Sequence, residues 1–142
     1  MADILELEVI TTTDAAIREE ITELYIPAYY GEAGILKNHL PYISLLKFGE
    51  ISFKDISGKH HYLYIENGFV EVRDNKIILI SDLAKRAEDF DIGEIRSGIE
   101  KIDKKINSAS AGEITAEELD VSLEEKEKLT IQADIIKKSG LN

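Results

Sequence analysis

The hydrophobic pattern of the chain changes its period near Asp82, and this change restricts the fold more than any other feature. Before Asp82, short runs rich in Ile, Val, Tyr and Phe are separated by turn-forming pairs about every ten residues, which is typical of an antiparallel sandwich or barrel. After Asp82, isoleucine recurs every three or four residues, which is typical of one face of a helix. The sequence therefore predicts an α+β chain with a β-sandwich first and helices second.

Asn and Asp mark the expected turns of the first part, because they tolerate the positive φ that a two-residue hairpin requires. On this ground residues 70–73 and 76–80 should pair as a hairpin. The near-alternating N-terminal run "ILELEVI" predicts a strand with Ile4, Leu7 and Val9 among its apolar residues. The turns are expected at four pairs: Phe48-Gly49, Ser57-Gly58, Asn67-Gly68 and Asp74-Asn75.

The second part predicts two amphipathic helices joined by a short loop, which form an antiparallel hairpin. An apolar stripe on the first helix should pack on the second helix, on the sandwich or on another subunit. The second helix has two possible starts, because Thr115 and Ser122 each begin a capping-box pattern. The stripe of the first helix is Ile92, Ile95, Ile99, Ile102 and Ile106, and that of the second is Leu119, Leu123, Leu129, Ala133 and Ile136.

The net charge of the chain restricts the classes of binding partner. Its 28 acidic and 17 basic residues give a formal net charge of −11, which argues against nucleic acid and against direct binding to anionic lipid. No run approaches the ~18 apolar residues of a membrane span, so no membrane insertion is expected. The N-terminus has no basic segment followed by an apolar run, so no signal peptide is expected. With no cysteine and three histidines, neither a disulfide nor a metal site is expected.

The stretch "GEAGILKNHLP", residues 31–41, is the densest run of special residues. Its glycines match neither GxxxxGK[ST] nor GxGxxG, so they indicate turn geometry rather than a phosphate-binding loop. Glu32 and His39 could in principle form an acid–base pair, but no nucleophile motif accompanies them. His60 and His61 are adjacent in a strand, so their rings point to opposite faces and do not share a metal ion. The residues thus favour a binding or structural protein over an enzyme.

Two stretches resemble the signatures of the ε subunit of F-type ATP synthases, which is called δ in mitochondria. The family's pattern G-E-x-G-I-L-P-N-H-x-P-x-I-S-x-L-x-x-G matches "GEAGILKNHLPYISLLKFG", except that Lys37 replaces the first proline. The pattern G-G-F-V-E-V-x-x-N-x-V-x-I-L-x-D matches "NGFVEVRDNKIILISD". The resemblance runs over nearly the whole chain. It implies a sandwich of about ten strands over residues 1–85 and a regulatory helical hairpin over residues 89–142.

The resemblance also implies a function without catalysis and without a cofactor. The chain would be a rotor subunit of the central stalk, a peripheral membrane protein on the cytoplasmic face of the bacterial plasma membrane that couples proton flow to ATP synthesis. Gly31, Glu32 and Ala33 would meet the ring of c subunits, and His39 and Pro41 would face the γ subunit. A free-standing acidic protein-binding module is the alternative.

In bacterial relatives the helical hairpin can fold against the sandwich or extend along γ, where it meets the α and β catalytic subunits and inhibits ATP hydrolysis. Some relatives bind ATP on this hairpin. Of the positions involved, only Asp91 is kept here; Lys85, Glu94 and Ile95 replace a glutamate, an arginine and an alanine. A carboxylate where an arginine would face phosphate should repel the ligand, so we expect weak ATP binding or none.

Overall fold

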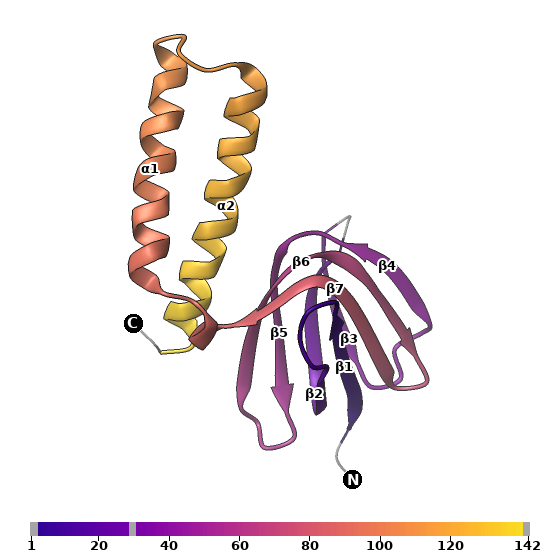
Figure 1. Ribbon diagram of the computed structural model, residues 1–142. Coiled ribbons are helices and arrows are strands. Elements are labelled where there is room, and N and C mark those ends of the chain that lie inside the picture. The colour runs from indigo at the N-terminus through magenta and orange to yellow at the C-terminus, as the bar shows by residue number, and fades with distance from the viewer. Residues whose placement is uncertain (1–2, 29–30, 141–142) are drawn as a thin grey trace. The chain divides into compact units, whose positions relative to one another are not determined.

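The computed structural model describes residues 3–28 and 31–140 (Figure 1). The chain divides into two compact units, one ending at Arg86 and one beginning at Ala87. The described part of the first unit holds seven strands: β1 (Leu5–Thr11), β2 (Ile17–Ala28), β3 (Gly31–Leu36), β4 (Tyr42–Leu46), β5 (Gly49–Asp55), β6 (His60–Arg73) and β7 (Lys76–Arg86). The second unit holds a 3-10 turn (Ala87–Asp89), α1 (Ile92–Ser110) and α2 (Ala116–Lys138).

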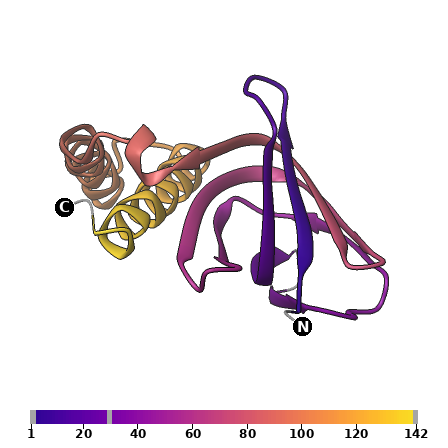
Figure 2. The ribbon, with the colours of Figure 1, turned by 90° about the horizontal axis from the view of Figure 1, so that it is seen from below.

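The predicted α+β architecture is confirmed, with seven strands in place of about ten. The lower number has a physical reason, because the long strands change partners along their length. β6 pairs with β5 as far as Ile65 and with β4 from Gly68 onward, while β7 accompanies it on the other side. Figure 2 shows the curvature of the long strands. One pairing is parallel, since β1 lies beside β7 while its other neighbour, β2, is antiparallel.

The pair Asn67-Gly68 does not end a strand, so the prediction of a turn there is wrong. Both residues have positive φ, 50° and 142°, yet β6 continues to Arg73. A Cβ atom on Gly68 would lie 1.9 Å from the carbonyl oxygen of Ile80, so only glycine fits here. The buried Ser81 hydroxyl lies 2.8 Å from the carbonyl oxygens of Glu66 and Leu83. The pair therefore marks a bend at which β6 stays bound to β7.

The predicted hairpin turn at Asp74-Asn75, which sets the register between β6 and β7, is confirmed. Arg73 pairs with Lys76, and the two residues between them have φ of 51° and 61°, as a tight hairpin turn requires. In β1 the buried residues are Leu5, Leu7 and Val9, whereas Ile4 is 37 % exposed, contrary to its place in the predicted strand. Strict alternation from Leu5 explains this difference, because Ile4 lies out of phase with the core face.

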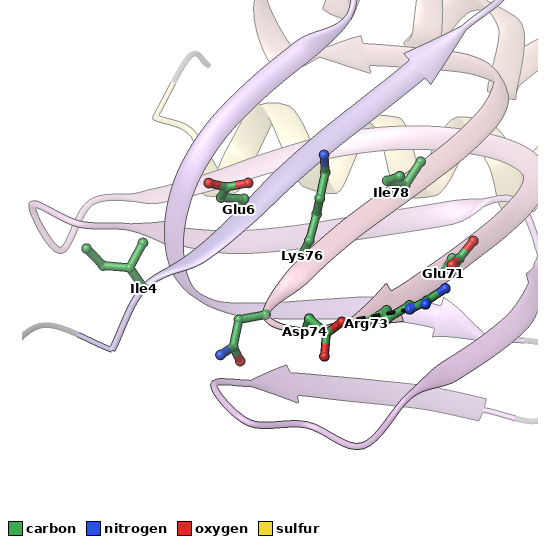
Figure 3. Close-up of a pocket in the computed structure, with 8 residues that line it drawn as sticks. Ile4, Glu6, Glu71, Arg73, Asp74, Lys76 and Ile78 are labelled. Atoms are coloured by element: carbon green, nitrogen blue, oxygen red, sulfur yellow. Dashed lines mark ion pairs between the residues drawn. The ribbon is translucent and has the colours of Figure 1, made fainter.

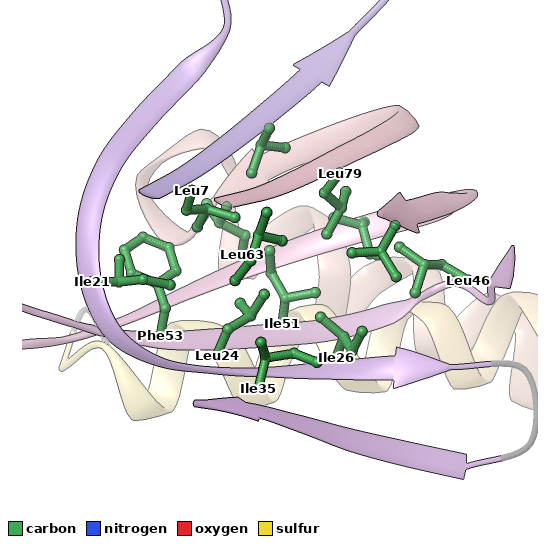
Figure 4. Close-up of a cluster of buried hydrophobic side chains, with 14 of the residues drawn as sticks. Leu7, Ile21, Leu24, Ile26, Ile35, Leu46, Ile51, Phe53, Leu63 and Leu79 are labelled. Atoms are coloured by element: carbon green, nitrogen blue, oxygen red, sulfur yellow. The ribbon is translucent and has the colours of Figure 1, made fainter. Parts of the chain in front are cut away.

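Alternate residues of the strands point inward, apart from a register shift in β2 between Ile21 and Glu23, and they form one apolar core (Figure 4). The core also takes the half-buried side chains of Ile17, Ala33 and Tyr42. Its buried members are Leu5, Leu7, Val9, Ile21, Leu24, Ile26, Ile35, Leu46, Ile51, Phe53, Leu63, Ile65, Val70, Val72, Ile77, Leu79 and Ala84.

The second helix begins after Thr115, which decides between the two predicted starts. The Thr115 hydroxyl accepts the backbone N–H of Glu118 at 3.1 Å, while Ser122 lies buried inside the helix and donates to the Glu118 carbonyl. At this turn of the helix the buried side chain is therefore Ser122 and not its neighbour Leu123. Leu123 is instead 47 % exposed, so its place in the predicted stripe is wrong.

The two helices pack as an antiparallel pair. A Cβ on Gly98 of α1 would lie 3.1 Å from the Leu129 side chain of α2, and Lys126 forms an ion pair of 2.6 Å with Asp103. Within the stripe of α1, Ile95 is buried. The other four residues of the stripe, Ile92, Ile99, Ile102 and Ile106, are half-buried.

Candidate docking surface

The outward face of strands β4, β6, β7 and β1 carries an apolar row that crosses all four strands. Leu45 pairs with Phe69, Phe69 with Ile80, and Ile80 with Ile10. Each of these residues has core-facing neighbours along its own strand, so the row points away from the core. Cross-strand partners lie about 4.5–5.5 Å apart, so the four side chains form one continuous strip.

A second row lies beside the first and mixes apolar with acidic residues. It runs from Ile43 through Glu71 and Ile78 to Glu8. Ile43 is 73 % exposed and Leu45 is 63 % exposed, which is unusual for large aliphatic side chains on one strand. We call the six apolar residues of the two rows the outer face: Ile10, Ile43, Leu45, Phe69, Ile78 and Ile80. Ile43, Leu45 and Phe69 are exposed, whereas the other three are half-buried. A contiguous apolar patch with exposed members and polar neighbours is typical of a protein interaction site.

The outer face ends in an open, charged hollow at the β6–β7 turn (Figure 3). The hollow has a volume of about 600 Å³. Ile78 belongs to both features, and Glu71 of the second row also lines the hollow, so the hollow and the outer face are continuous. The carboxylate of Asp74 lies 3.8 Å from Arg73 Nε. The residues that line the hollow are Ile4, Glu6, Glu71, Arg73, Asp74, Asn75, Lys76 and Ile78.

The loop between β3 and β4 is bonded to this hollow by a pair of asparagines. The backbone N–H of Asn38 donates to Asn75 Oδ1 at 2.6 Å, and Asn75 Nδ2 donates to Asn38 Oδ1 at 3.4 Å. Lys37, which replaces the expected proline, forms an ion pair of 3.8 Å with Asp3. Sequence reasoning did not find the asparagine contact, although each asparagine is a fixed position of one of the two signature patterns.

His39 and Pro41 lie on this same loop. His39 is half-buried, and its ring meets that of Tyr42 edge-on at 5.7 Å between centroids. His39 Nδ1 lies 2.7 Å from the carbonyl oxygen of Leu40, which can only accept, so that nitrogen carries a proton. Pro41 is exposed, and Leu40 beside it is 79 % exposed. The loop therefore presents apolar side chains at the edge of the outer face.

Gly31, Glu32 and Ala33 lie at the opposite end of β3. Gly31 has a φ of 132°, a conformation that favours glycine. Glu32 is exposed opposite Pro27, whereas Ala33 is half-buried and packs on the core. Of the three, only Glu32 offers a long side chain to a partner.

The structure does not bring Glu32 and His39 together. Glu32 begins β3, and His39 follows the turn after Leu36, where its N–H donates to the Leu36 carbonyl. An extended strand separates the Cα atoms of Glu32 and Leu36 by about 13 Å. An acid–base pair needs hydrogen-bond reach, so this arrangement does not support one.

A separate hydrogen-bond network centres on Asp55 at the β5–β6 turn. Asp55 Oδ1 accepts from the Ser57 hydroxyl at 2.6 Å and from two backbone N–H groups, while Oδ2 accepts from His61 Nε2 at 2.8 Å. The Ser57 hydroxyl, followed by His61, holds the pKa of the Asp55 carboxyl well below its usual range. His61 also stacks on Phe53 at 4.9 Å, whereas His60 is exposed. The network fixes a turn and leaves no open reactive group.

Asp91 caps the first residues of α1. Its Oδ1 accepts the N–H groups of Gly93 at 2.8 Å and Glu94 at 3.3 Å. The carboxylate therefore has a structural role, and the Glu94 side chain beside it is exposed. Weak ATP binding or none remains a prediction. In residues 3–28 and 31–140, no group of three His, Cys, Asp or Glu is placed to hold a metal ion, and no helix has the length and apolarity of a membrane span.

Comparison with known proteins shows the family of this chain. Residues 4–87 match the model of the ATP synthase delta/epsilon chain, beta-sandwich domain. The ATP synthase epsilon chain of Solibacter usitatus is 31 % identical over 129 residues, which cover 91 % of this chain and 96 % of that protein. The epsilon chain of Dichelobacter nodosus is 33 % identical over 119 residues, with coverages of 84 % and 82 %.

The fold also resembles a chain of a solved assembly. That assembly is the mitochondrial ATP synthase of Euglena gracilis, comprising OSCP, F1 and the c-ring. The alignment has a TM-score of 0.69 at 19 % identity and covers 100 % of this chain and 84 % of the other. At this identity the likeness concerns the fold alone.

Proposed function

The chain belongs to the ATP synthase delta/epsilon family, and we propose that it joins the central stalk of a rotary ATP synthase through the outer face of its sandwich. The family predicted from the two signature stretches is thereby confirmed. Like its relatives named epsilon chain, it is a non-catalytic subunit of the complex. Membership of this family leaves no support for the alternative of a free-standing acidic module.

The γ subunit is the proposed partner of the outer face. Burying a Leu or Ile side chain contributes about 1.5–3 kcal/mol. Leu45 and Ile43 retain 63 % and 73 % of their exposure in this chain, so most of that gain is still open to a partner. The acids and bases of the neighbouring hollow form a polar rim that would select the partner and its orientation. His39 and Pro41, on the loop beside the rim, would extend the same interface.

Glu32 is the proposed contact with the ring of c subunits. It is exposed at one end of β3, while the loop with His39 lies beyond the other end. The two groups would therefore meet different partners, with Gly31 shaping the chain beside Glu32. This contact would transmit the rotation of the ring to the stalk, and replacing Glu32 should uncouple proton flow from synthesis without unfolding the sandwich.

The helical hairpin is the proposed regulatory element. Four isoleucines of the α1 stripe are only half-buried, so a second surface could bury them further. Extended along γ, the hairpin would contact the α and β subunits and slow ATP hydrolysis. Deleting residues 89–142 should then raise the hydrolysis rate of the assembled enzyme, and an unchanged rate would reduce the hairpin to a structural tail. We place the subunit on the cytoplasmic face of a bacterial plasma membrane, as a peripheral protein.

The outer row carries the proposal, and a substitution on it provides the test. Leu45→Ser removes the exposed β4 end of the strip but little of the core, so γ should bind roughly 5- to 30-fold more weakly, from about 1–2 kcal/mol of lost burial. Ile56→Ser is the matched control, because Ile56 is 56 % exposed in the β5–β6 turn, away from the outer face. Calorimetric titration with purified γ measures both. A wild-type chain that does not bind γ would restore the free-standing module.

A further inference from the structure

Asn75 joins three segments that are distant in sequence. Its side chain bonds Asn38 of the β3–β4 loop twice, and its carbonyl oxygen accepts the Glu6 N–H of β1 at 3.0 Å. Its own position is the second residue of the β6–β7 turn, with a φ of 61°. Asparagine suits this position, because it adopts positive φ more readily than most residues and its side chain carries both a donor group and an acceptor group.

The geometry assigns both ends of the amide pair. A backbone N–H can only donate, so the Asn75 atom that lies 2.6 Å from the Asn38 nitrogen is the carbonyl oxygen. The amide nitrogen then faces Asn38 Oδ1. Asn38 also has a positive φ, 66°, so both residues combine a left-handed backbone with a side chain turned to the other.

The other contacts that hold the β3–β4 loop in place are weaker than the hydrogen bonds between Asn38 and Asn75. The loop lies between the last residue of β3 and the first of β4, outside the strand ladders. The ion pair between Lys37 and Asp3 is long and mostly exposed on the Asp3 side, and such pairs contribute little. Leu40 is 79 % exposed, so its side chain contributes almost no packing that would hold the loop in place. The amide pair is thus the best-formed link between the loop and the β6–β7 turn among the contacts described.

The same residue lines the hollow that continues into the outer face. We propose that Asn75 is a positioning residue, which holds the β3–β4 loop in the conformation that γ binds. This proposal rests on the proposed docking to γ. A loop that is already ordered loses less conformational entropy on binding, so these hydrogen bonds increase affinity through the loop that they order.

The test compares Asn75→Gly with Asn67→Gly in the full chain, because Asn67 also has a positive φ, 50°, and does not line the hollow. Glycine keeps the positive φ at either position, but only Asn75→Gly removes the bonds to the loop. We expect Asn75→Gly to weaken γ binding about tenfold and to speed hydrogen exchange at the Asn38 amide. Asn67→Gly should leave both near wild type, and the two variants should show similar thermal stability.

Asn38→Gly breaks the same pair from the loop side, so the double variant should be no weaker than either single one. Asn75→Asp keeps the acceptor for the Asn38 N–H and should retain most of the affinity. If the wild type binds γ and Asn75→Gly binds it equally well, the positioning role of Asn75 is wrong. The proposed docking to γ is then unaffected. If the wild type does not bind γ, the proposed function fails together with the positioning role.

Discussion

Replacing Gly68 by alanine should be among the most damaging small substitutions in the sandwich. The new Cβ would lie 1.9 Å from the carbonyl oxygen of Ile80 and 2.9 Å from Ser81 Cα, both backbone atoms of β7. Ordinary contact needs about 3.5 Å, so β6 and β7 would have to separate by about 1.5 Å. The strands cannot give way there without loss, because Phe69 pairs with Ile80 at that point.

Three costs add up. A left-handed or strained φ on a residue with a side chain costs about 1–3 kcal/mol, overpacking costs about 1–3 kcal/mol, and each ladder hydrogen bond lost costs about 0.5–1.5 kcal/mol. We expect a loss of about 3–6 kcal/mol, against a total of about 5–15 kcal/mol for a typical domain. Gly68→Ala should therefore leave the sandwich barely folded.

Urea unfolding followed by tyrosine fluorescence measures this loss. All six tyrosines lie between residues 25 and 64, so the signal reports on the sandwich and not on the helices. Gly58→Ala is the control, because its φ of 89° is also positive but nothing lies within 4 Å of the new Cβ. The control should lose only about 1–2 kcal/mol. If Gly68→Ala loses no more than Gly58→Ala, the contact with Ile80 does not set the bend of β6.

Three further substitutions test other parts of the structure. Asp55→Asn should flatten the acid dependence of stability: the folded-state pKa of this carboxyl lies below its unfolded value of 3.8, so its contribution is complete above about pH 4 and is lost as the pH falls further. Acid unfolding of both proteins measures this, and equal acid sensitivity would contradict it. Thr115→Ala should destabilise the hairpin by about 1 kcal/mol through loss of the helix cap, as measured by circular dichroism at 222 nm. An effect as small as that of Thr130→Ala, a substitution inside the same helix, would contradict this prediction. Lys126→Ala should cost less than about 1 kcal/mol, since both partners of its ion pair with Asp103 are over 40 % exposed, and a larger loss would mean that the pair fixes the helix register.

The sequence predicted those features that depend on neighbours along the chain. The helix stripe, the Thr115 cap and the Asp74-Asn75 turn all follow from local spacing and local backbone preference. Asn67-Gly68 carries the same local signal as a turn but lies within a strand. Its backbone is stabilised by Ser81 and β7, which approach from elsewhere in the chain, and no local pattern reveals that.

The candidate site shows the same division. Residues of the outer face are apolar and look like core residues in sequence; only the pairing of four strands shows that Leu45 and Ile80 point outward. The bond between Asn38 and Asn75 spans 37 positions, so the two signature stretches gave no sign of it until folded. Ser122 was missed for another reason, since a search for hydrophobic periodicity passes over a buried polar residue.

The parallel pairing of β1 with β7 has a consequence for the newly made protein. Thr11 pairs with Ser81, 70 residues later. At about 5–20 residues per second, a ribosome needs about 4–14 s to make that interval, and until then one edge of β1 has no partner. The sandwich can close only after β7 has emerged, whereas the helical hairpin is made of neighbours and can form as soon as it is synthesised. During that interval the open edge of β1 is the part of the nascent chain most exposed to wrong pairing and to chaperones.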